Sequence, residues 1–425
     1  MNIYEYPSRG QYKALLARPT LSFAEIEMRV RPIIDEVAQK GDEALRKFAL
    51  DFDNILLNDF KVTDAELRDA ENQISVELKN AIDQAYENIS VFHKAQQVEE
   101  AQVETMPGVF CWRKSVGIQK VGIYIPGGSA PLFSTVLMLA IPAQIAGCQQ
   151  IVLCSPSNHP AIYYAAQKCG ITEAYRIGGA QAVAAMAVGT ETVPAVYKIF
   201  GPGNQYVTAA KQIVSQMGVA IDMPAGPSEV AVLADHRANA AFIASDLLSQ
   251  AEHGADSQVL LVGTDKDIIL KTIEEVKLQL AFLPRKELAA KALENSKAIL
   301  VKDLDEATYL LNEYAAEHLI LSIENPEEVA ANIVNAGSIF LGDYTPESCG
   351  DYASGTNHTL PTNGYARAYS GVSLDSFVKK ITYQKISKAG LEKLGPIVEI
   401  MAEAEQLDAH KNAVTIRLKN IKDQA

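Results

Sequence analysis

The sequence has few cysteines, and none of them is paired at the spacing of a metal or redox motif. Five cysteines stand far apart along the chain: Cys111, Cys148, Cys154, Cys169 and Cys349. An odd, scattered set is typical of reduced thiols rather than of a disulfide framework. This usage predicts a protein of the cytoplasm.

Long apolar runs are missing as well. The longest one, residues 136–143, is much shorter than the roughly 20 residues that a bilayer span needs. The first ten residues, MNIYEYPSRG, contain no apolar signal-peptide core. We therefore expect a protein that does not enter a membrane.

Positive charge is scarce relative to negative charge. The chain has 38 Lys and Arg against 52 Asp and Glu, which gives a net charge of −14. This balance disfavours nucleic acids and anionic membrane surfaces as partners. A hydrophobic content of 48% is ordinary for a globular protein, and 425 residues are enough for two or three domains.

The dinucleotide fingerprint G-x-G-x-x-G is also absent. From residue 108 on, strand-like and helix-like segments alternate, which predicts a parallel sheet wound with helices. Loops rich in Gly follow three of its strands, at residues 127–129, 178–181 and 201–204, where backbone N–H groups can approach a phosphate. The nearest match to the fingerprint, GPGNQY, has Tyr206 where the third Gly belongs. Nucleotide binding and ordinary βα turns therefore both remain open on the pattern alone.

The flanking regions have a different character. The first hundred residues read as helices, and a second α/β unit with strand patterns resumes after residue 228. The tail from about residue 374 reads as helical, with too few apolar residues to form a core of its own. We expect this tail to dock on the body of the chain or on a second subunit.

Polar residues then gather at the ends of predicted elements. A helix after the strand 230–234, with Asp235 as its expected N-cap, places Gln250 and His253 on one face of its last turn. Such a pair also often does no more than cap helix carbonyls. Glu317 and His318 stand where a helix meets a strand, and we expect them exposed at a sheet edge, either as a site or as a solvated helix end.

A long loop and the tail complete the polar set. The segment 343–371 has little regular pattern and carries Asp351 and His358, and loops of this length are often functional. Together Gln250, His253, Asp351 and His410 offer nitrogen and oxygen ligands suited to Zn²⁺ or a similar ion, although no spacing motif joins them. His318 is suited to take a proton from an alcohol near neutral pH, and Glu317 to activate water.

Several long blocks resemble one family. IDMPAGPSEV with the downstream SQAEH is similar to the signature of the histidinol dehydrogenases. The family's other blocks follow in order as VGIYIPGGSAPLFSTVLM, KIFGPGN, AAEHL, YSGVSLDSFVKK and LDAHKNAV. The resemblance implies a zinc-dependent cytoplasmic homodimer that oxidises L-histidinol to L-histidine through an aldehyde with two NAD⁺. This reaction is the last step of histidine biosynthesis.

The resemblance also implies roles for individual residues. The zinc ligands would be Gln250, His253, Asp351 and His410, the last from the partner subunit, with His318 as the base for alcohol oxidation and Glu317 activating the water that adds to the aldehyde. Further substrate contacts would come from Ser228, Glu405 and His358, and NAD contacts from Tyr124, Gln181 and Asn204.

The implied fold has two incomplete Rossmann-like parallel-sheet domains, a helical N-terminal region and a helical tail that docks on the partner subunit. We divide it into an N-terminal segment (1–20), a discontinuous domain with the metal and acid/base residues (21–122 and 229–370), an NAD-binding domain (123–228) and a dimerisation tail (371–425). Two rivals remain: a metallohydrolase that uses the same residues without NAD, and a non-catalytic binding protein.

Overall fold

The computed structural model describes residues 1–18, 23–53, 55–56, 59–127 and 130–424. Residues 128 and 129 of the first Gly-rich loop lie outside this part of the chain. The chain divides into two compact units, one of residues 1–96 and 118–377 and one of residues 97–117 and 378–425. Of the helices in the described ranges, none has the length and apolar character that a bilayer span requires.

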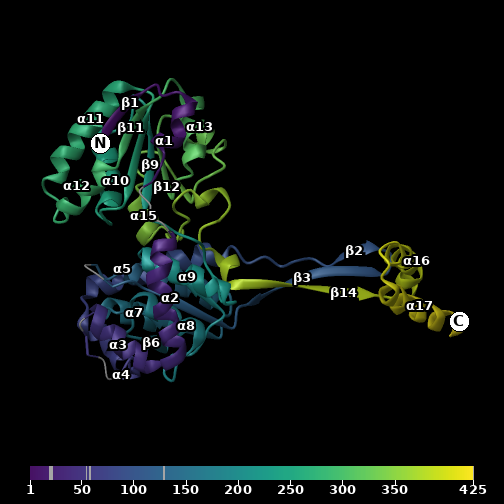
Figure 1. The fold of residues 1–425 in the computed structure, drawn as a ribbon. Helices are drawn as coiled ribbons and strands as arrows, with labels where there is room; N and C mark the ends of the chain where they lie inside the picture. The colour runs from purple at the N-terminus through teal and green to yellow at the C-terminus, as the bar shows by residue number, and fades with distance from the viewer. Residues whose placement is uncertain (19–22, 54, 57–58, 128–129, 425) are drawn as a thin grey trace. The chain divides into compact units, whose positions relative to one another are not determined.

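The first unit contains a six-stranded parallel sheet in the order β1-β11-β10-β9-β12-β13 (Figure 1). Its strands are β1 (Asn2–Glu5), β9 (Glu229–Ala234), β10 (Gln258–Gly263), β11 (Lys297–Leu300), β12 (His318–Ser322) and β13 (Ser338–Leu341). Alternate residues of β9 face opposite sides, because side chains of a strand point alternately up and down. Val230 and Val232 meet one group of helices, and Ala231 and Leu233 meet the other.

Helices cover both faces of this sheet. One face packs against α10 (Ala240–Ala251), α11 (Lys266–Leu280) and α12 (Lys286–Glu294). The other packs against α1 (Arg9–Leu15), α13 (Leu304–Tyr314) and α14 (Pro326–Ala330). The short helices α15 (Glu347–Tyr352), η2 (Tyr365–Arg367) and η3 (Leu374–Phe377) follow β13. Coverage on both faces explains why the strands read as unbroken apolar runs.

A second parallel sheet in this unit has the order β6-β5-β4-β7-β8. Its strands are β4 (Lys120–Tyr124), β5 (Gln150–Cys154), β6 (Glu173–Tyr175), β7 (Lys198–Phe200) and β8 (Ala220–Ile221). One face packs against α4 (Asp64–Asp69), η1 (Ala70–Gln73), α5 (Val76–Lys94), α6 (Phe133–Ile145) and α7 (Pro160–Lys168). The other packs against α2 (Phe23–Lys40), α3 (Asp42–Asp53), α8 (Gly179–Val188) and α9 (Gln205–Gln216). Two parallel-sheet α/β domains are thereby confirmed.

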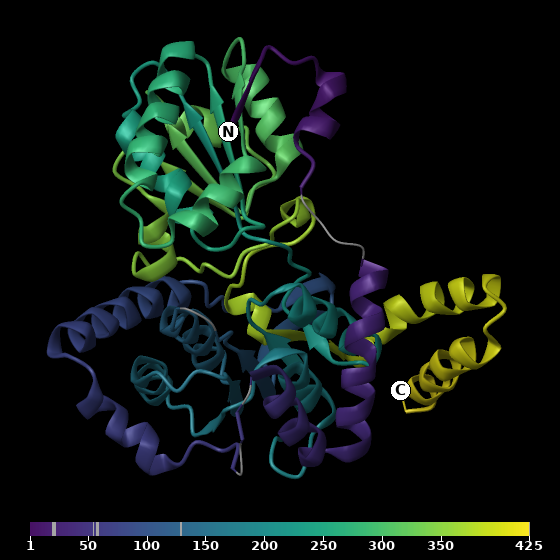
Figure 2. The same cartoon turned by 60° about the vertical axis from the view of Figure 1, so that its left-hand side comes forward.

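The N-terminal helices pack differently from the predicted grouping, which joined residues 21–122 to residues 229–370. Val30 and Ile34 of α2 are fully buried in the core of the five-stranded sheet, next to α8 and α9. The long purple helix α2 lies beside teal helices of that sheet in Figure 2. Their apolar faces find their partners there, so residues 23–94 belong with residues 118–223 by packing.

The second unit is small and built from two distant chain segments. Strands β2 (Val103–Met106), β3 (Val109–Gly117) and β14 (Val378–Ile386) form an antiparallel sheet, followed by α16 (Lys388–Ala404) and α17 (Asp408–Asp423). A helical C-terminal end is confirmed, although β14 precedes it where the pattern predicted only helix. The helices α16 and α17 pack on each other, and a side chain at Gly395 would overlap Leu418.

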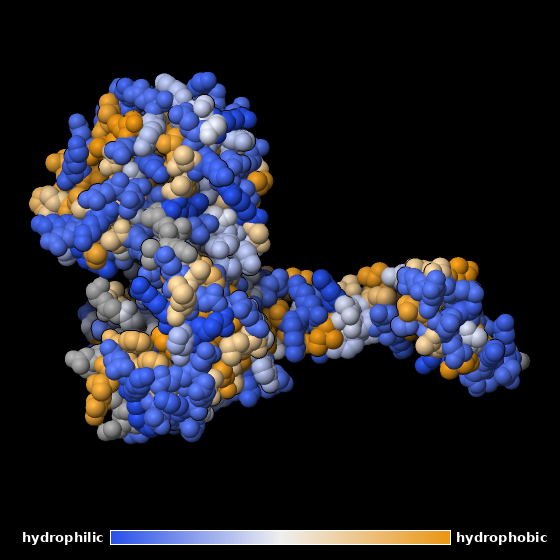
Figure 3. Space-filling model, viewed as in Figure 1, coloured by the Kyte–Doolittle hydropathy of each residue, from blue (hydrophilic) through white to orange (hydrophobic). Residues whose placement is uncertain are grey.

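Apolar side chains remain exposed on this helical pair. They are Ile397, Ile400, Met401, Leu407 and Ile416. Orange apolar atoms reach the surface of the pair in Figure 3. Exposed apolar patches of this kind are common at interfaces with other chains.

The buried ion pair of Lys211 and Asp222 generates a stability prediction. Lys211 Nζ lies 2.5 Å from Asp222 Oδ1 and donates to the Gly201 carbonyl, and both side chains are at most 3% exposed. Removing one partner of such a pair leaves the other charge buried and costs about 3–5 kcal/mol. We expect Lys211→Met to lower the urea midpoint of unfolding strongly. The control Lys168→Met removes a partly exposed pair with Asp83 and should cost less than about 1 kcal/mol. Equal midpoints for the two variants would contradict the prediction.

Candidate functional site

Glu317 and His318 lie at the amino-terminal end of β12, a central strand of the six-stranded sheet. Both are buried, so the expectation that they are exposed at a sheet edge is wrong. The reason is the neighbouring strands: β9 and β13 flank β12 on both sides. Helix α13 ends at Tyr314, and a left-handed residue, Ala315 with φ 53°, turns the chain toward Glu317.

His318 is surrounded by carboxylates. Its Nε2 lies 3.2 Å from Asp351 Oδ1 on α15, and its Nδ1 lies 3.8 Å from Glu317 Oε2. Burial alone would lower the pKa of this imidazole, but the charges of Glu317, Asp351 and Glu347 outweigh burial and raise it. These charges stabilise the imidazolium that forms when a neutral His318 accepts a proton.

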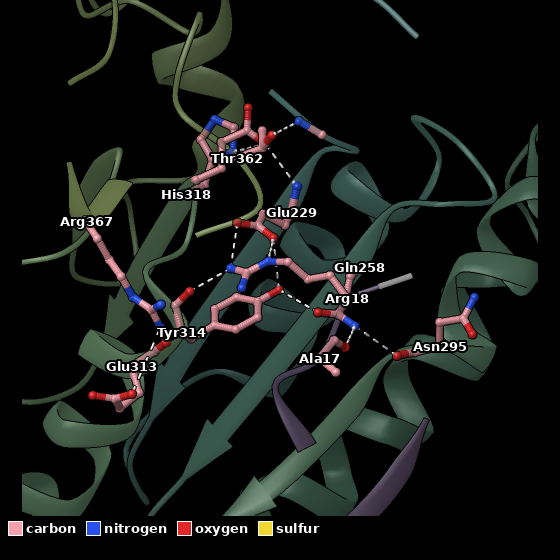
Figure 4. Close-up of polar contacts among 12 residues, drawn as sticks. Ala17, Arg18, Glu229, Gln258, Asn295, Glu313, Tyr314, His318, Thr362 and Arg367 are labelled. Carbon is pink, nitrogen blue, oxygen red and sulfur yellow. Dashed lines mark hydrogen bonds and ion pairs between the residues drawn. The ribbon is translucent and has the colours of Figure 1, made fainter. Parts of the chain in front are cut away.

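Glu317 has a fixed orientation. Its Oε2 accepts a hydrogen bond of 2.9 Å from the backbone N–H of Glu229, the first residue of β9. Burial raises the pKa of this carboxyl to about 8, although His318 opposes the shift. The side chain of Glu229 points toward Arg18 and Tyr314 (Figure 4).

Gln250 lies in the last turn of α10, as predicted, whereas the prediction that His253 shares this turn is wrong. The helix starts differently, because Asn239 Oδ1 accepts from the backbone N–H groups of Ala241 and Phe242. Asp235, the predicted N-cap, is occupied elsewhere: its two oxygens accept from the backbone of Arg237 and Glu324. Helix α10 ends at Ala251, so His253 follows in a turn.

The amide of Gln250 is the most unusual polar group nearby. It is buried, and neither its oxygen nor its nitrogen has a hydrogen-bond partner within the described residues. Burial lowers the pKa of His253, while the charge of Asp351 acts in the opposite direction. No cluster of three or more His, Cys, Asp or Glu side chains arranged to hold a metal ion occurs in the described ranges.

His358 and Ser228 lie on loops of the same unit. His358 is held at both ring nitrogens, with Nδ1 2.7 Å from the Asp351 carbonyl oxygen and Nε2 3.0 Å from Thr135 Oγ1. This ring therefore ties the loop after α15 to helix α6. Ser228 immediately precedes β9 and is half-buried, one residue before the backbone N–H that holds Glu317.

One carboxylate near the site was missed by sequence reasoning. Glu347 at the start of α15 is buried; Ser249 Oγ donates to its Oε1 at 2.7 Å, while its Oε2 lacks a partner among the described residues. Burial raises its pKa to about 7. No motif marks Glu347, because its proximity to His318 arises only from tertiary packing.

A separate cavity of about 830 Å³ opens at the carboxyl ends of strands in the five-stranded sheet. Tyr124, Gln181 and Asn204, the predicted NAD contacts, all line it. Tyr124 Oη accepts from the backbone N–H of Gly179, and Asn204 Oδ1 caps α9 through Tyr206 and Val207. Both α8 and α9 therefore begin at the wall of this cavity.

Two further features shape the cavity. Gly201 has φ 131°, and a side chain there would lie 2.1 Å from the Tyr124 carbonyl oxygen, so only glycine fits. Arg29 of α2 lines the cavity and donates to Tyr206 Oη at 3.3 Å. Sequence reasoning missed Arg29, since it lies on a distant helix outside every motif.

Glu405 and His410, the remaining predicted site residues, belong to the second unit. Glu405 is the C-cap of α16, and His410 lies in the first turn of α17. Both side chains are exposed within the chain. The first unit therefore holds the other ten predicted site residues.

Comparisons with known proteins identify the family. The family model for histidinol dehydrogenase matches residues 16–418. A histidinol dehydrogenase of Bacteroides thetaiotaomicron is 60% identical and covers 99% of this chain and 100% of the relative. One from Salmonella typhimurium is 52% identical, covering 98% and 97%. The crystal structure of histidinol dehydrogenase from Elizabethkingia anophelis superposes with a TM-score of 0.97 at 52% identity, over 99% of both chains. The chain belongs to the histidinol dehydrogenase family and is a dehydrogenase.

Proposed function

We propose that this protein oxidises L-histidinol through L-histidinal to L-histidine with two NAD⁺, as the last step of histidine biosynthesis. Family membership over nearly the whole chain supports the substrate and the reaction. The observation that carries the mechanism is the buried group of Glu317, His318 and Asp351 at the head of β12. A base and a water-activating carboxylate side by side suit two successive oxidations.

NAD is the cofactor we propose for the 830 Å³ cavity. Its size lies in the range of small-molecule sites, and Tyr124, Gln181 and Asn204 line it. The positive ends of the α8 and α9 helix dipoles lie at its wall, and Arg29 offers a positive charge, both of which suit a pyrophosphate. When bound, NAD⁺ takes up the hydride that leaves the substrate carbon. Gln181 Oε1, buried without a partner among the described residues, is available to orient the cofactor.

Zinc is the metal we propose, held by Gln250, His253 and Asp351 with His410. The donor set fits: the Gln250 amide lacks a described partner, and the charges of Asp351 and His253 act on each other. Burial raises the pKa of Glu347 to about 7 and the charge of Asp351 raises it further, so a cation bound here would offset the repulsion between these carboxyl groups. When bound, zinc would hold the substrate through its imidazole and amino nitrogens.

We assign the proton transfers to residues of β12. His318 takes the proton of the alcohol in the first oxidation. Glu317 then takes a proton from the water that adds to the aldehyde, and the resulting hydrate gives its hydride to the second NAD⁺ and releases a proton as the carboxylic acid forms. Burial of both side chains keeps bulk water away from the reactive aldehyde. Ser228 and His358 would contact the substrate from the adjoining loops.

A homodimer with shared sites accounts for the second unit. His410 and Glu405 would complete the site of the partner subunit. The exposed apolar residues of α16 and α17 support an interface on these helices. The chain's own buried apolar residues in this unit are few, so a second subunit would supply the missing apolar contacts.

The reaction is tested by its stoichiometry. We expect two equivalents of NADH per L-histidinol, because the aldehyde is held until the second hydride transfer. Activity should be lost on chelation and return with Zn²⁺, in parallel with zinc content measured by elemental analysis. One equivalent would mean that the aldehyde escapes, and none would favour a metallohydrolase or a binding protein.

The two half-reactions separate the roles of the β12 pair. His318→Ala should abolish NADH formation from L-histidinol, since no other group takes the alcohol proton. Glu317→Gln should reduce oxidation of L-histidinal by about 10²–10⁴-fold and affect the alcohol step much less. Glu324→Gln, at an exposed carboxylate after the same strand, is the control. Equal losses of both steps in Glu317→Gln would refute this division.

Mixed dimers test the shared site. His410→Ala and Glu317→Gln proteins should each be nearly inactive in the overall reaction. After the two are unfolded and refolded together, heterodimers carry one intact site, which restores up to about a quarter of wild-type activity. Refolding each variant alone provides the baseline. A mixture no more active than its components would place His410 in its own chain's site.

A further inference from the structure

Glu317 depends on a residue far from it in the sequence. The backbone N–H of Glu229 donates a hydrogen bond to the Glu317 carboxylate. The side-chain carboxylate of Glu229 in turn accepts two hydrogen bonds from Arg18. We propose that Arg18 is a positioning residue for Glu317 and thereby serves the aldehyde oxidation specifically. This role of Arg18 rests on the role proposed above for Glu317 in activating water.

Arg18 and Glu229 form a buried, bidentate ion pair. Arg18 Nε donates to Glu229 Oε2, and Arg18 Nη2 donates to Glu229 Oε1 at 2.8 Å (Figure 4). The two side chains are 12% and 2% exposed. A planar guanidinium matches a carboxylate in this geometry and fixes its direction as well as its position.

The same guanidinium also holds the other chain segment that leads to Glu317. Arg18 Nη2 donates to the carbonyl oxygen of Tyr314 at 2.6 Å. Tyr314 ends α13, and only the left-handed Ala315 and one further residue separate it from Glu317. Arg18 therefore fixes the distance between the donor of the Glu317 hydrogen bond and the turn that delivers the Glu317 side chain.

A ring of polar contacts fixes Arg18 in turn. Tyr314 Oη donates to Gln258 Oε1 at 2.9 Å, and Gln258 Nε2 donates to the carbonyl oxygen of Ala17 at 3.2 Å (Figure 4). The guanidinium also lies 4.1 Å from the centre of the Tyr314 ring. None of these residues belongs to the set proposed to contact the substrate, so Arg18 acts on Glu317 only through the structure around it.

Charge adds to the geometric effect. Glu229 is fully buried, and its negative charge disfavours ionisation of Glu317 nearby. Arg18 neutralises that charge. Loss of Arg18 would therefore leave the buried Glu229 carboxyl without its charge partner and leave Glu317 less fixed, which weakens a carboxylate that must accept a proton from water.

The test compares the two half-reactions in full-length Arg18→Met, Arg18→Lys and Glu229→Gln enzymes. We expect kcat for L-histidinal oxidation to fall by about 10²-fold in Arg18→Met, the size of effect that small misplacements produce, with its KM and the alcohol step nearly unchanged. Arg18→Lys should restore little of the lost L-histidinal oxidation, because an ammonium cannot donate two parallel hydrogen bonds to the Glu229 carboxylate as a guanidinium does. Glu229→Gln keeps the shape of the side chain and should show a smaller but equally selective loss.

Control variants distinguish a selective effect on Glu317 from a general disturbance of the sheet. Arg237→Met removes an exposed pair with Glu324 at the opposite end of β9 and should leave both steps intact. Equal losses in both steps, or a rise in KM alone through displacement of Ser228, would overturn the proposal. If Arg18→Met does not fold, the selectivity of Glu229→Gln decides. If Glu317→Gln itself is unselective, the proposed function fails instead, whatever the Arg18 variants show.

Discussion

The burial of charge at the head of β12 is the constraint on which the site depends. Ionised carboxylates and imidazoles are costly to remove from water, and they persist only where partners compensate them. Here Glu317 accepts a backbone N–H, His318 contacts Asp351, and Glu229 behind them binds Arg18. The site is therefore a network of mutually dependent groups rather than isolated side chains on a surface.

The two sheets use opposite ends for their proposed tasks. In the five-stranded sheet, the cavity lies at the carboxyl ends of the strands, where α/β proteins usually bind ligands. In the six-stranded sheet, Glu229 and His318 begin their strands, and Gln250 lies in the last turn of the helix that leads to β10. The amino-terminal edge therefore holds the acid/base groups. Helix α10 ends at that edge, which brings its last turn into the site without a long loop.

Sequence reasoning reached most of this arrangement where local rules apply. Alternating strand and helix patterns predicted the two α/β domains, and the helical pattern predicted the position of Gln250 in the last turn of α10. The resemblance to the family supplied Tyr124, Gln181 and Asn204, which then lined one cavity. Contacts between segments that are distant in the sequence could not be predicted from local patterns. The burial of Glu317, the proximity of Glu347 and the grip of Arg18 on Glu229 depend on segments joined only by folding. The prediction that Asp235 caps α10 was wrong, because Asp235 instead accepts a hydrogen bond from the backbone N–H of the distant Glu324.

The second unit carries a consequence for the order of synthesis. Its long ladder pairs residues 109–117 with residues 378–386, so β3 leaves the ribosome well before its partner strand exists. Chains are made at about 5–20 residues per second, so β3 waits for many seconds without its ladder. Strand β14 forms one edge of the finished sheet and carries Lys379, Lys380 and Lys385. Charged side chains on an edge strand disfavour its pairing with strands of other molecules. The newborn chain can thus complete its first unit in large part before the second one exists, and any association through α16 and α17 must wait until residues 388–423 have been made.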